Sequence, residues 1–151
     1  MSVGIGYDSH RFAEGRRLVL GGVEVEHARG LAGHSDADVL THAVIDALLG
    51  AAGSGDIGTL FPDDDELWRD ADSIDLLRTV IGTIGGRIVN IDATLVCEEP
   101  RIGPLRAEIE RTLAEATSAR VSVKATTNEG MGWIGRGEGI ACIAVASVES
   151  D

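Results

Sequence analysis

The chain has 151 residues, of which 44% are apolar, and a formal net charge of −12 at neutral pH. This length and composition predict one globular domain, residues 1–151, with a single buried core. The acidic charge argues against a nucleic-acid partner, and the lack of an apolar run of roughly 20 residues argues against a membrane span. With two cysteines and no basic leader, the chain is expected in the cytoplasm, without a signal or transit peptide.

The first third of the chain predicts strands that lead into a helix. Residues 3–8 have the pattern of an opening strand, and residues 17–20 and 23–25 are joined by two glycines, as in a β-hairpin. A helix is expected next, because apolar residues then recur at helical spacing. We expect Ser35 to be its N-cap and Gly50 to mark its end.

The rest of the chain predicts alternating helices and strands. The last strand is a nearly continuous apolar run, which is typical of a strand covered on both faces. We therefore predict an α/β fold of the α+β type, with a mixed β-sheet and helices packed on one face. The expected elements are a helix capped by Ser73 and ended by Gly85-Gly86, a strand at residues 89–97, a helix opened by Pro104, and strands at residues 121–125 and 140–148.

Asp8, His10 and His42 are candidate metal ligands. Residues i and i+2 of a strand point to the same face, so Asp8 and His10 can approach one ion, and carboxylate and imidazole groups suit zinc. His42 lies on the predicted helix, with Asp38 and Asp46 one turn away on either side. We expect Asp46 to bond the outer nitrogen of His42, as carboxylates do for metal-bound histidines. Spacing alone leaves open that these are ordinary surface residues.

Two segments have the composition of phosphate-binding or polyol-binding loops. Residues 33–36 place a hydroxyl and backbone N–H groups at a helix start, which suits an anion and equally suits an ordinary N-cap. The loop at residues 53–65 is rich in Gly and Asp. It is interpreted either as a mobile surface loop or as a binding loop for a sugar alcohol.

Residues 124–139 combine hydroxyls, glycines and charged side chains in a short span. The hydroxyls of Thr126 and Thr127 could cradle a diphosphate, Arg136 could stabilise its charge, and Glu129 could hold a hard cation. The glycines formally satisfy G-x-G-x-x-G, but the strand expected after them argues against a dinucleotide site.

In these segments the chain resembles the 2-C-methyl-D-erythritol 2,4-cyclodiphosphate synthase family. The resemblance extends from near the first residue to near the last, in the same order, and is least specific in residues 68–95. The chain departs from the usual pattern at Ala37, where a glycine is common, and in the acidic pair Glu98-Glu99. The matching stretches are Gly4-x-Gly6-x-Asp8-x-His10-x-Phe12, His34-Ser35-Asp36-x-Asp38-Val39-x-x-His42-Ala43, Asp46-Ala47-Leu48-Leu49-Gly50, Gly55-Asp56-Ile57-Gly58-x-x-Phe61-Pro62-Asp63, Lys124-Ala125-Thr126-Thr127 and Gly135-Arg136-Gly137-Glu138-Gly139.

The resemblance implies a role for each of these segments in binding a small-molecule, cytidine-diphosphate-linked substrate. Asp8, His10 and His42 would hold Zn2+, and Glu129 would hold a second divalent cation, Mg2+ or Mn2+. Catalytic contacts would come from His34, Asp56 and Thr127. The substrate-binding residues would be Ser35, Asp56, Ile57, Gly58, Phe61 and Asp63 at the methylerythritol phosphate end, Cys97, Pro100, Ile102, Thr126 and Thr127 at the cytidine end, and also Trp133 and Arg136.

The resemblance also implies a reaction and an assembly. The 2-phosphate of 4-diphosphocytidyl-2-C-methyl-D-erythritol 2-phosphate would attack the β-phosphorus and expel CMP, in non-mevalonate isoprenoid biosynthesis. Family members are homotrimers with active sites between subunits, and a central cavity at Trp133, Arg136 and Glu138 would take an isoprenoid diphosphate. The alternatives are a metal-dependent phosphohydrolase, a carrier of isoprenoid diphosphates, and a structural oligomer with an incidental metal.

Overall fold

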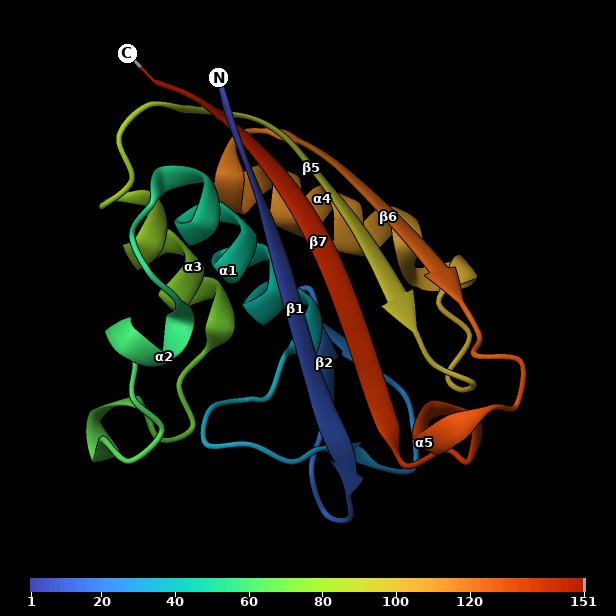
Figure 1. Ribbon diagram of the computed structural model, residues 1–151. Coiled ribbons are helices and arrows are strands. Elements are labelled where there is room, and N and C mark those ends of the chain that lie inside the picture. Colours follow the sequence, from blue (N-terminus) through green and yellow to red (C-terminus); the bar gives the residue numbers. More distant parts are fainter. Residues whose placement is uncertain (151) are drawn as a thin grey trace.

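A five-stranded sheet forms the centre of the fold in the computed structural model, which describes residues 1–150 (Figure 1). The strand order is β4-β1-β7-β5-β6; β5 and β6 are parallel, and the other neighbours are antiparallel. The predicted mixed sheet is therefore confirmed. The strands are β1 (Ser2–Ala13), β4 (Gly30–Leu31), β5 (Arg87–Val96), β6 (Arg120–Thr126) and β7 (Gly139–Glu149).

The predicted hairpin forms a separate two-stranded sheet of β2 (Leu18–Leu20) and β3 (Val23–Val25). Gly21 and Gly22, which join the two strands, both have positive φ angles that L side chains adopt at a cost. Their N–H groups donate to the buried carboxylate of Asp38, at 2.9 and 2.7 Å. Asp38 therefore ties the hairpin to the start of the first helix.

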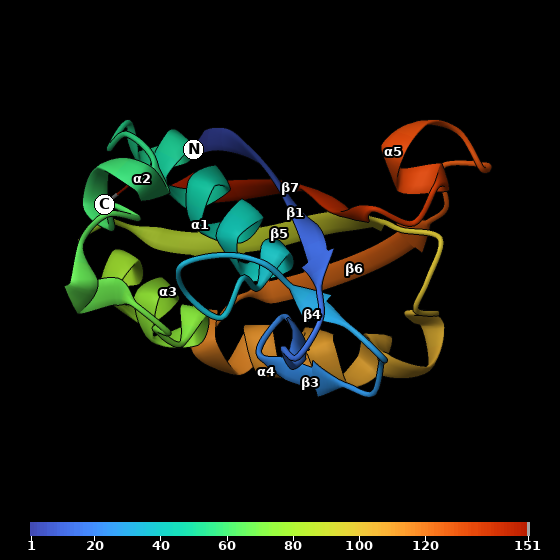
Figure 2. The ribbon, with the colours of Figure 1, turned by 90° about the horizontal axis from the view of Figure 1, so that it is seen from below.

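Three longer helices lie on one side of the sheet: α1 (Val39–Ala52), α3 (Ser73–Ile81) and α4 (Arg106–Thr117). In Figure 2, α3 and α4 lie below the strands and the short helix α5 (Gly132–Gly135) lies above them. A short helix α2 (Ile57–Leu60) and two 3-10 turns, η1 (Glu66–Trp68) and η2 (Gly103–Leu105), complete the described elements. Among residues 1–150, no helix has the length and hydropathy needed to cross a membrane.

Five predicted helix boundaries were wrong. Helix α1 continues past Gly50 to Ala52, and Gly53 is its C-cap. Asp38, and not Ser35, caps α1, because its carboxylate accepts the N–H of Thr41 at 3.0 Å. Asp72 caps α3, so Ser73 is the first helical residue instead of the cap. Helix α3 also ends at Gly82, before the glycine pair predicted to end it. Pro104 lies in η2, and α4 begins two residues later.

Two glycines of β1 allow α1 to lie directly on the sheet. A Cβ atom at Gly4 would overlap the carbonyl oxygen of Ala47, and one at Gly6 would overlap that of Ala43. Side chains at these positions would push the helix away from the strand. The glycines thus bring His42 of α1 within reach of the far end of β1.

The face of β1 and β7 that points away from α1 is apolar and exposed. Ile5 pairs with Val145, and Tyr7 pairs with Ile143, so these side chains form one continuous patch with Val3. Their exposed fractions range from 38% for Val145 to 70% for Ile5. The prediction that the last strand is covered on both faces is therefore wrong for the single chain. An exposed apolar patch of this kind is typical of an interface.

Strand β6 forms one edge of the sheet. Its inner neighbour is β5, and α4 packs against it. The N–H of Val123, in the middle of β6, donates to the side chain of Glu110 on α4 at 3.1 Å. One backbone donor of this edge strand is therefore occupied by a side chain of the same subunit.

Candidate functional site

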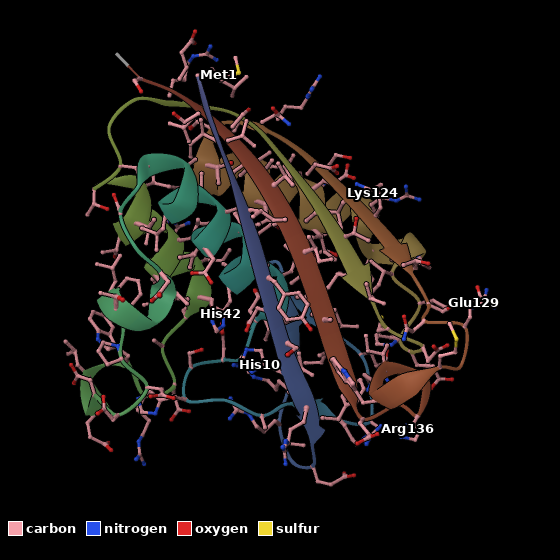
Figure 3. All side chains as sticks on the ribbon, viewed as in Figure 1. Met1, His10, His42, Lys124, Glu129 and Arg136 are labelled. Atoms are coloured by element: carbon pink, nitrogen blue, oxygen red, sulfur yellow. The ribbon has the colours of Figure 1, made fainter. Side chains whose placement is uncertain are left out.

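Asp8, His10 and His42 come together between β1 and α1, and Figure 3 shows the two histidines side by side. Oδ2 of Asp8 lies 2.8 Å from Nε2 of His10 and 3.2 Å from Nδ1 of His42. The two ring nitrogens are 3.3 Å apart. His42 is 9% exposed, and the other two side chains are half-buried. The prediction that these three residues form one group is confirmed.

The contact made by Nδ1 of His10, the nitrogen that points away from the cluster, determines the role of Nε2, the nitrogen that faces it. Nδ1 of His10 lies 2.8 Å from the carbonyl oxygen of Ala32, which can only accept. Nδ1 therefore carries the hydrogen, and in the neutral ring Nε2 presents its lone pair to Asp8. An oxygen anion and imidazole lone pairs that converge on one point need a cation between them. This donor set fits a divalent metal ion of the zinc type.

The cluster shifts the ionisation of its members. Burial alone would raise the pKa of Asp8, but the hydrogen bonds and positive charge that the His10 and His42 rings supply when protonated outweigh it and lower the pKa to about 2. Burial also disfavours charge on His10, yet the Asp8 carboxylate raises the pKa of that imidazole. Asp8 therefore stays a carboxylate and attracts positive charge to this point, from a proton or from a metal ion.

The outer nitrogen of His42 does not contact Asp46, so that prediction was wrong. Nε2 of His42 lies 2.8 Å from Oγ of Ser73 and 3.2 Å from Oγ of Ser35. Asp46 instead accepts the N–H of Ile57 at 2.8 Å, at the start of α2. The spacing i, i+4 pointed to a neighbour on α1, whereas the partners of Nε2 come from α3 and from the segment before α1.

A cavity of about 550 Å3 opens beside the cluster and is mostly polar at its metal-ligand end. Phe61 and Trp68 meet edge to face in its outer wall, with ring centroids 4.8 Å apart. Nε2 of His34 donates to the carbonyl oxygen of Asp65 at 2.8 Å, which joins two walls of the cavity. The lining residues are Asp8, His10, Gly33, His34, Ser35, His42, Ile57, Gly58, Phe61, Pro62, Asp63, Asp64, Trp68 and Leu76.

Asp56 does not line this cavity, unlike most of the other residues predicted for the methylerythritol end. Its exposed carboxylate caps α2 and accepts the N–H and the hydroxyl of Thr59, at 2.8 and 2.9 Å. The N–H of Thr59 is the main reason that the pKa of Asp56 is lowered. In this structure Asp56 holds the start of α2, which carries Ile57 and Gly58.

A second cavity, of about 490 Å3, lies at the ends of β5 and β6. The residues predicted for the cytidine end gather here: Cys97, Pro100, Ile102, Thr126 and Thr127. Pro100 and Ile102 belong to the connection between β5 and η2, while the two threonines close β6 and the turn after it.

Of the acidic pair Glu98-Glu99, Glu98 has a structural role. The carboxylate of Glu98 accepts the N–H groups of Asn128 and Gly130, at 2.9 and 3.2 Å. These two residues flank Glu129, whose φ of 54° is unusual for a residue with a side chain. Glu98 therefore holds the turn that presents Glu129.

Glu129 does not join the Asp8 group within one chain. Strands β7 and β5 separate β1, which carries His10, from β6, which leads to Glu129. Figure 3 shows Glu129 beyond the β6 edge of the sheet, far across the view from His42. The predicted residues thus form two half-sites: the Asp8 cavity, and the Cys97 cavity with Glu129.

Trp133 and Arg136 line a third cavity, of about 680 Å3, with the ends of β1 and β7 nearby. Both side chains are exposed, and Nε of Arg136 donates to Glu138 at 2.6 Å. On the other side of this cavity, the guanidinium of Arg29 lies 4.5 Å from the centre of the Phe12 ring. Of the three cavities that contain predicted site residues, this is the only one lined by more than one arginine: Arg11, Arg29 and Arg136.

Sequence reasoning missed the residues that support the Asp8 group from outside. Arg16 donates to the carbonyl oxygens of Gly33 and Ser35, at 2.7 and 2.6 Å, and so holds the cavity wall next to His10. Ser73 and Asp36 contact each other behind His42. Each lies far from its partner in sequence, so no local spacing could have indicated these contacts.

The fold and site together define a small α+β protein with an Asp–His–His group that could hold a metal ion at the end of a cavity with both polar and apolar walls. The YgbB family matches residues 1–149, and the chain belongs to this family.

Relatives of known name support this assignment over the whole chain. The chain is 55% identical to the 2-C-methyl-D-erythritol 2,4-cyclodiphosphate synthase of Syntrophomonas wolfei, with 99% of each chain covered. It is 57% identical to that of Symbiobacterium thermophilum, with 98% of each covered. A solved structure of 2C-methyl-D-erythritol-2,4-cyclodiphosphate synthase in a CDP-bound form superposes with a TM-score of 0.89 at 34% identity, covering 97% of this chain and 99% of that one.

Proposed function

We propose that the chain converts 4-diphosphocytidyl-2-C-methyl-D-erythritol 2-phosphate to 2-C-methyl-D-erythritol 2,4-cyclodiphosphate and CMP. It would be a phosphorus–oxygen lyase of non-mevalonate isoprenoid biosynthesis. Membership of the YgbB family and the names of its full-length relatives support this activity. The single observation that carries it is the convergence of Asp8, His10 and His42 at one end of a cavity large enough for a sugar-alcohol phosphate.

The cation-binding residues follow from the donor sets. Asp8, His10 and His42 would hold Zn2+, and Glu129 would hold Mg2+ or Mn2+, because a lone carboxylate suits a hard cation that keeps most of its water. When bound, these ions would neutralise charge on the phosphate oxygens. The chain itself supplies ligands that are already close together, since Asp8 and His10 share one strand face.

The cavity residues would bind and orient the substrate without a covalent intermediate. An oxygen of the 2-phosphate would form a bond to the β-phosphorus, while the bond from that phosphorus to the bridging oxygen breaks and its electron pair leaves with CMP. His34, Ser35, Ile57, Gly58, Phe61 and Asp63 would hold the methylerythritol phosphate end. Holding both phosphates of one molecule together removes much of the entropic barrier, so no side-chain nucleophile is required.

The two half-sites and the apolar face favour a homotrimer with active sites between subunits. One substrate needs the Asp8 cavity for one end and the Cys97 cavity for the other, and these lie at different edges of the same sheet. We infer that each active site combines the Asp8 cavity of one subunit with Cys97, Pro100, Ile102, Thr126, Thr127 and Glu129 of its neighbour. The exposed patch on β1 and β7 would be buried at the centre of this assembly.

Two further parts of the proposal concern ligands and location. Trp133 and Arg136 would line the central cavity of the trimer, where Arg136 could bind the diphosphate of an isoprenoid. The enzyme would act in the cytoplasm. Its two cysteines are buried and unpaired among the described residues, which fits a reducing compartment.

Phosphorus NMR of the reaction tests the activity. Purified protein is incubated with the substrate and magnesium, with and without a zinc chelator, and the same is done with His42→Ala. We expect CMP and a cyclic diphosphate, and loss of both on chelation and in the variant. Release of inorganic phosphate would show a phosphohydrolase instead, and no turnover by folded, zinc-loaded protein would show a binding protein.

A further inference from the structure

Behind His42, two side chains that the proposed reaction does not use form a short hydrogen-bonded chain. Oγ of Ser73 contacts Oδ1 of Asp36 on one side and lies 2.8 Å from Nε2 of His42 on the other. The backbone N–H of Ser73 also donates to Oδ2 of Asp36, at 3.0 Å. Ser73 is fully buried, so water does not reach its hydroxyl.

Between Asp36, Ser73 and His42, one arrangement of hydrogens leaves no acceptor facing another acceptor. A carboxylate can only accept, so the single hydroxyl hydrogen of Ser73 is donated to Asp36. The contact between Ser73 and His42 must then have Nε2 of His42 as its donor. Oγ of Ser35, 3.2 Å from the same nitrogen, already accepts the N–H of Ala37 and is placed as a second acceptor.

With the hydrogen on Nε2, the other nitrogen of the neutral ring has its lone pair free. Nδ1 of His42 faces Oδ2 of Asp8 at 3.2 Å and Nε2 of His10 at 3.3 Å. The carbonyl of Ala32 does the same for His10 from the other side of the cluster. Both rings are thus held in the tautomer that presents a lone pair to the same point.

We propose that Asp36 and Ser73 are positioning residues that hold His42 in the Nε2–H tautomer and so prepare Nδ1 for a metal ion. This series of hydrogen bonds is firmly anchored, because Asp36 also accepts the N–H of Asp38 at 3.1 Å, and the N–H of Asp36 donates to the carbonyl oxygen of Ala71. It therefore links the residues before α1 to the first residue of α3. This inference rests on the metal site of the proposed function.

Zinc affinity is the first readout, measured by competition with a chromophoric chelator for the wild type, Ser73→Ala and Asp36→Asn. Loss of such an outer partner typically weakens metal binding by about 10- to 100-fold, and we expect a loss of this size in both variants. Thr79→Ala is the matched control, because it removes a hydroxyl from the exposed face of the same helix. Its zinc affinity should equal that of the wild type.

Nitrogen-15 NMR of the histidine rings in metal-free protein is the second readout, and a purely structural role would not change it. At a pH where His42 is neutral, the wild type should show hydrogen on Nε2, and Ser73→Ala should show a mixture of tautomers. If both variants lose thermal stability but keep wild-type zinc affinity and the Nε2–H signal, the proposal is wrong. If the wild type itself binds no zinc, the proposed metal site is wrong. The NMR result still decides whether Ser73 and Asp36 hold His42 in the Nε2–H tautomer.

Discussion

Gly6 of β1 lies against the carbonyl oxygen of Ala43 on α1, one residue away from His42 in sequence. This contact sets the separation of strand and helix at the point where the three candidate ligands meet. Asp8 lies two residues beyond Gly6, on the same strand. A residue without a side chain is therefore as necessary to the geometry of the cluster as the ligands themselves.

Gly6→Ala should destabilise the protein and loosen the cluster. The new methyl group would overlap backbone, which cannot rotate away, and overpacking of this kind costs about 1–3 kcal/mol or more. Urea unfolding measures the change, and zinc affinity should fall in parallel. Gly85→Ala is the control, because a Cβ atom there would meet nothing within 4 Å. Equal stability of both variants would show that α1 can shift without cost.

Glu98→Ala should free the turn that carries Glu129. The variant removes the acceptor for two backbone N–H groups, and a bond to a charged acceptor contributes about 1.5–3 kcal/mol. Hydrogen exchange at Asn128 and Gly130 should therefore become at least about tenfold faster. Glu99→Ala, which changes an exposed neighbour, should leave both rates unchanged. Unchanged exchange in Glu98→Ala would mean that the turn is held by other contacts.

Cys97 should resist alkylation at neutral pH although it borders the proposed cytidine cavity. Burial, with a smaller effect of Glu98, raises the pKa of this thiol to about 11. Only the thiolate reacts, so its rate should rise about tenfold per pH unit up to that pKa, whereas a free thiol levels off near pH 8.5. Iodoacetamide labelling followed by mass spectrometry measures this profile. A plateau near pH 8.5 in folded protein would contradict the assigned burial.

Mixed oligomers should test whether each active site uses two subunits. His42→Ala damages the Asp8 cavity and Thr127→Val damages the Cys97 cavity, so each variant alone should be inactive. After denaturation and refolding together in equal amounts, about a quarter of the sites in a trimer would combine two intact halves. The mixture should then regain about that fraction of wild-type activity. Activity that stays at the level of the separate variants would place both halves of a site in one subunit.

Local periodicity predicted the parts of the site that depend on one element. Asp8 and His10 share a face because side chains in a strand alternate, and His42 belongs to a helix that its apolar spacing made clear. The hairpin at Gly21-Gly22 was predicted from turn chemistry, which also depends only on neighbouring residues.

Contacts between distant segments could not be predicted in this way. Ser35 and Asp38 are both good N-caps by type, and Asp38 takes the role because the same carboxylate also binds the hairpin amides. The partner of His42 comes from α3, 31 residues away, so the helical neighbour Asp46 was a reasonable but wrong choice. Likewise, the apolar run of β7 does not show from sequence alone whether both faces of the strand are covered by the same chain. In the structure one face is exposed at Ile143.

The contact between Glu110 and the edge strand β6 has a consequence for how copies of the chain can associate. A bare strand edge is a template on which further chains can add without limit, as in fibrils. Here Glu110 blocks one donor of that edge, while the apolar surface is offered by a sheet face at Ile5 and Val145. Contacts through such a face form a ring of fixed size when the rotation between subunits closes, as in the proposed trimer. The fold thus favours a finite particle over open-ended growth.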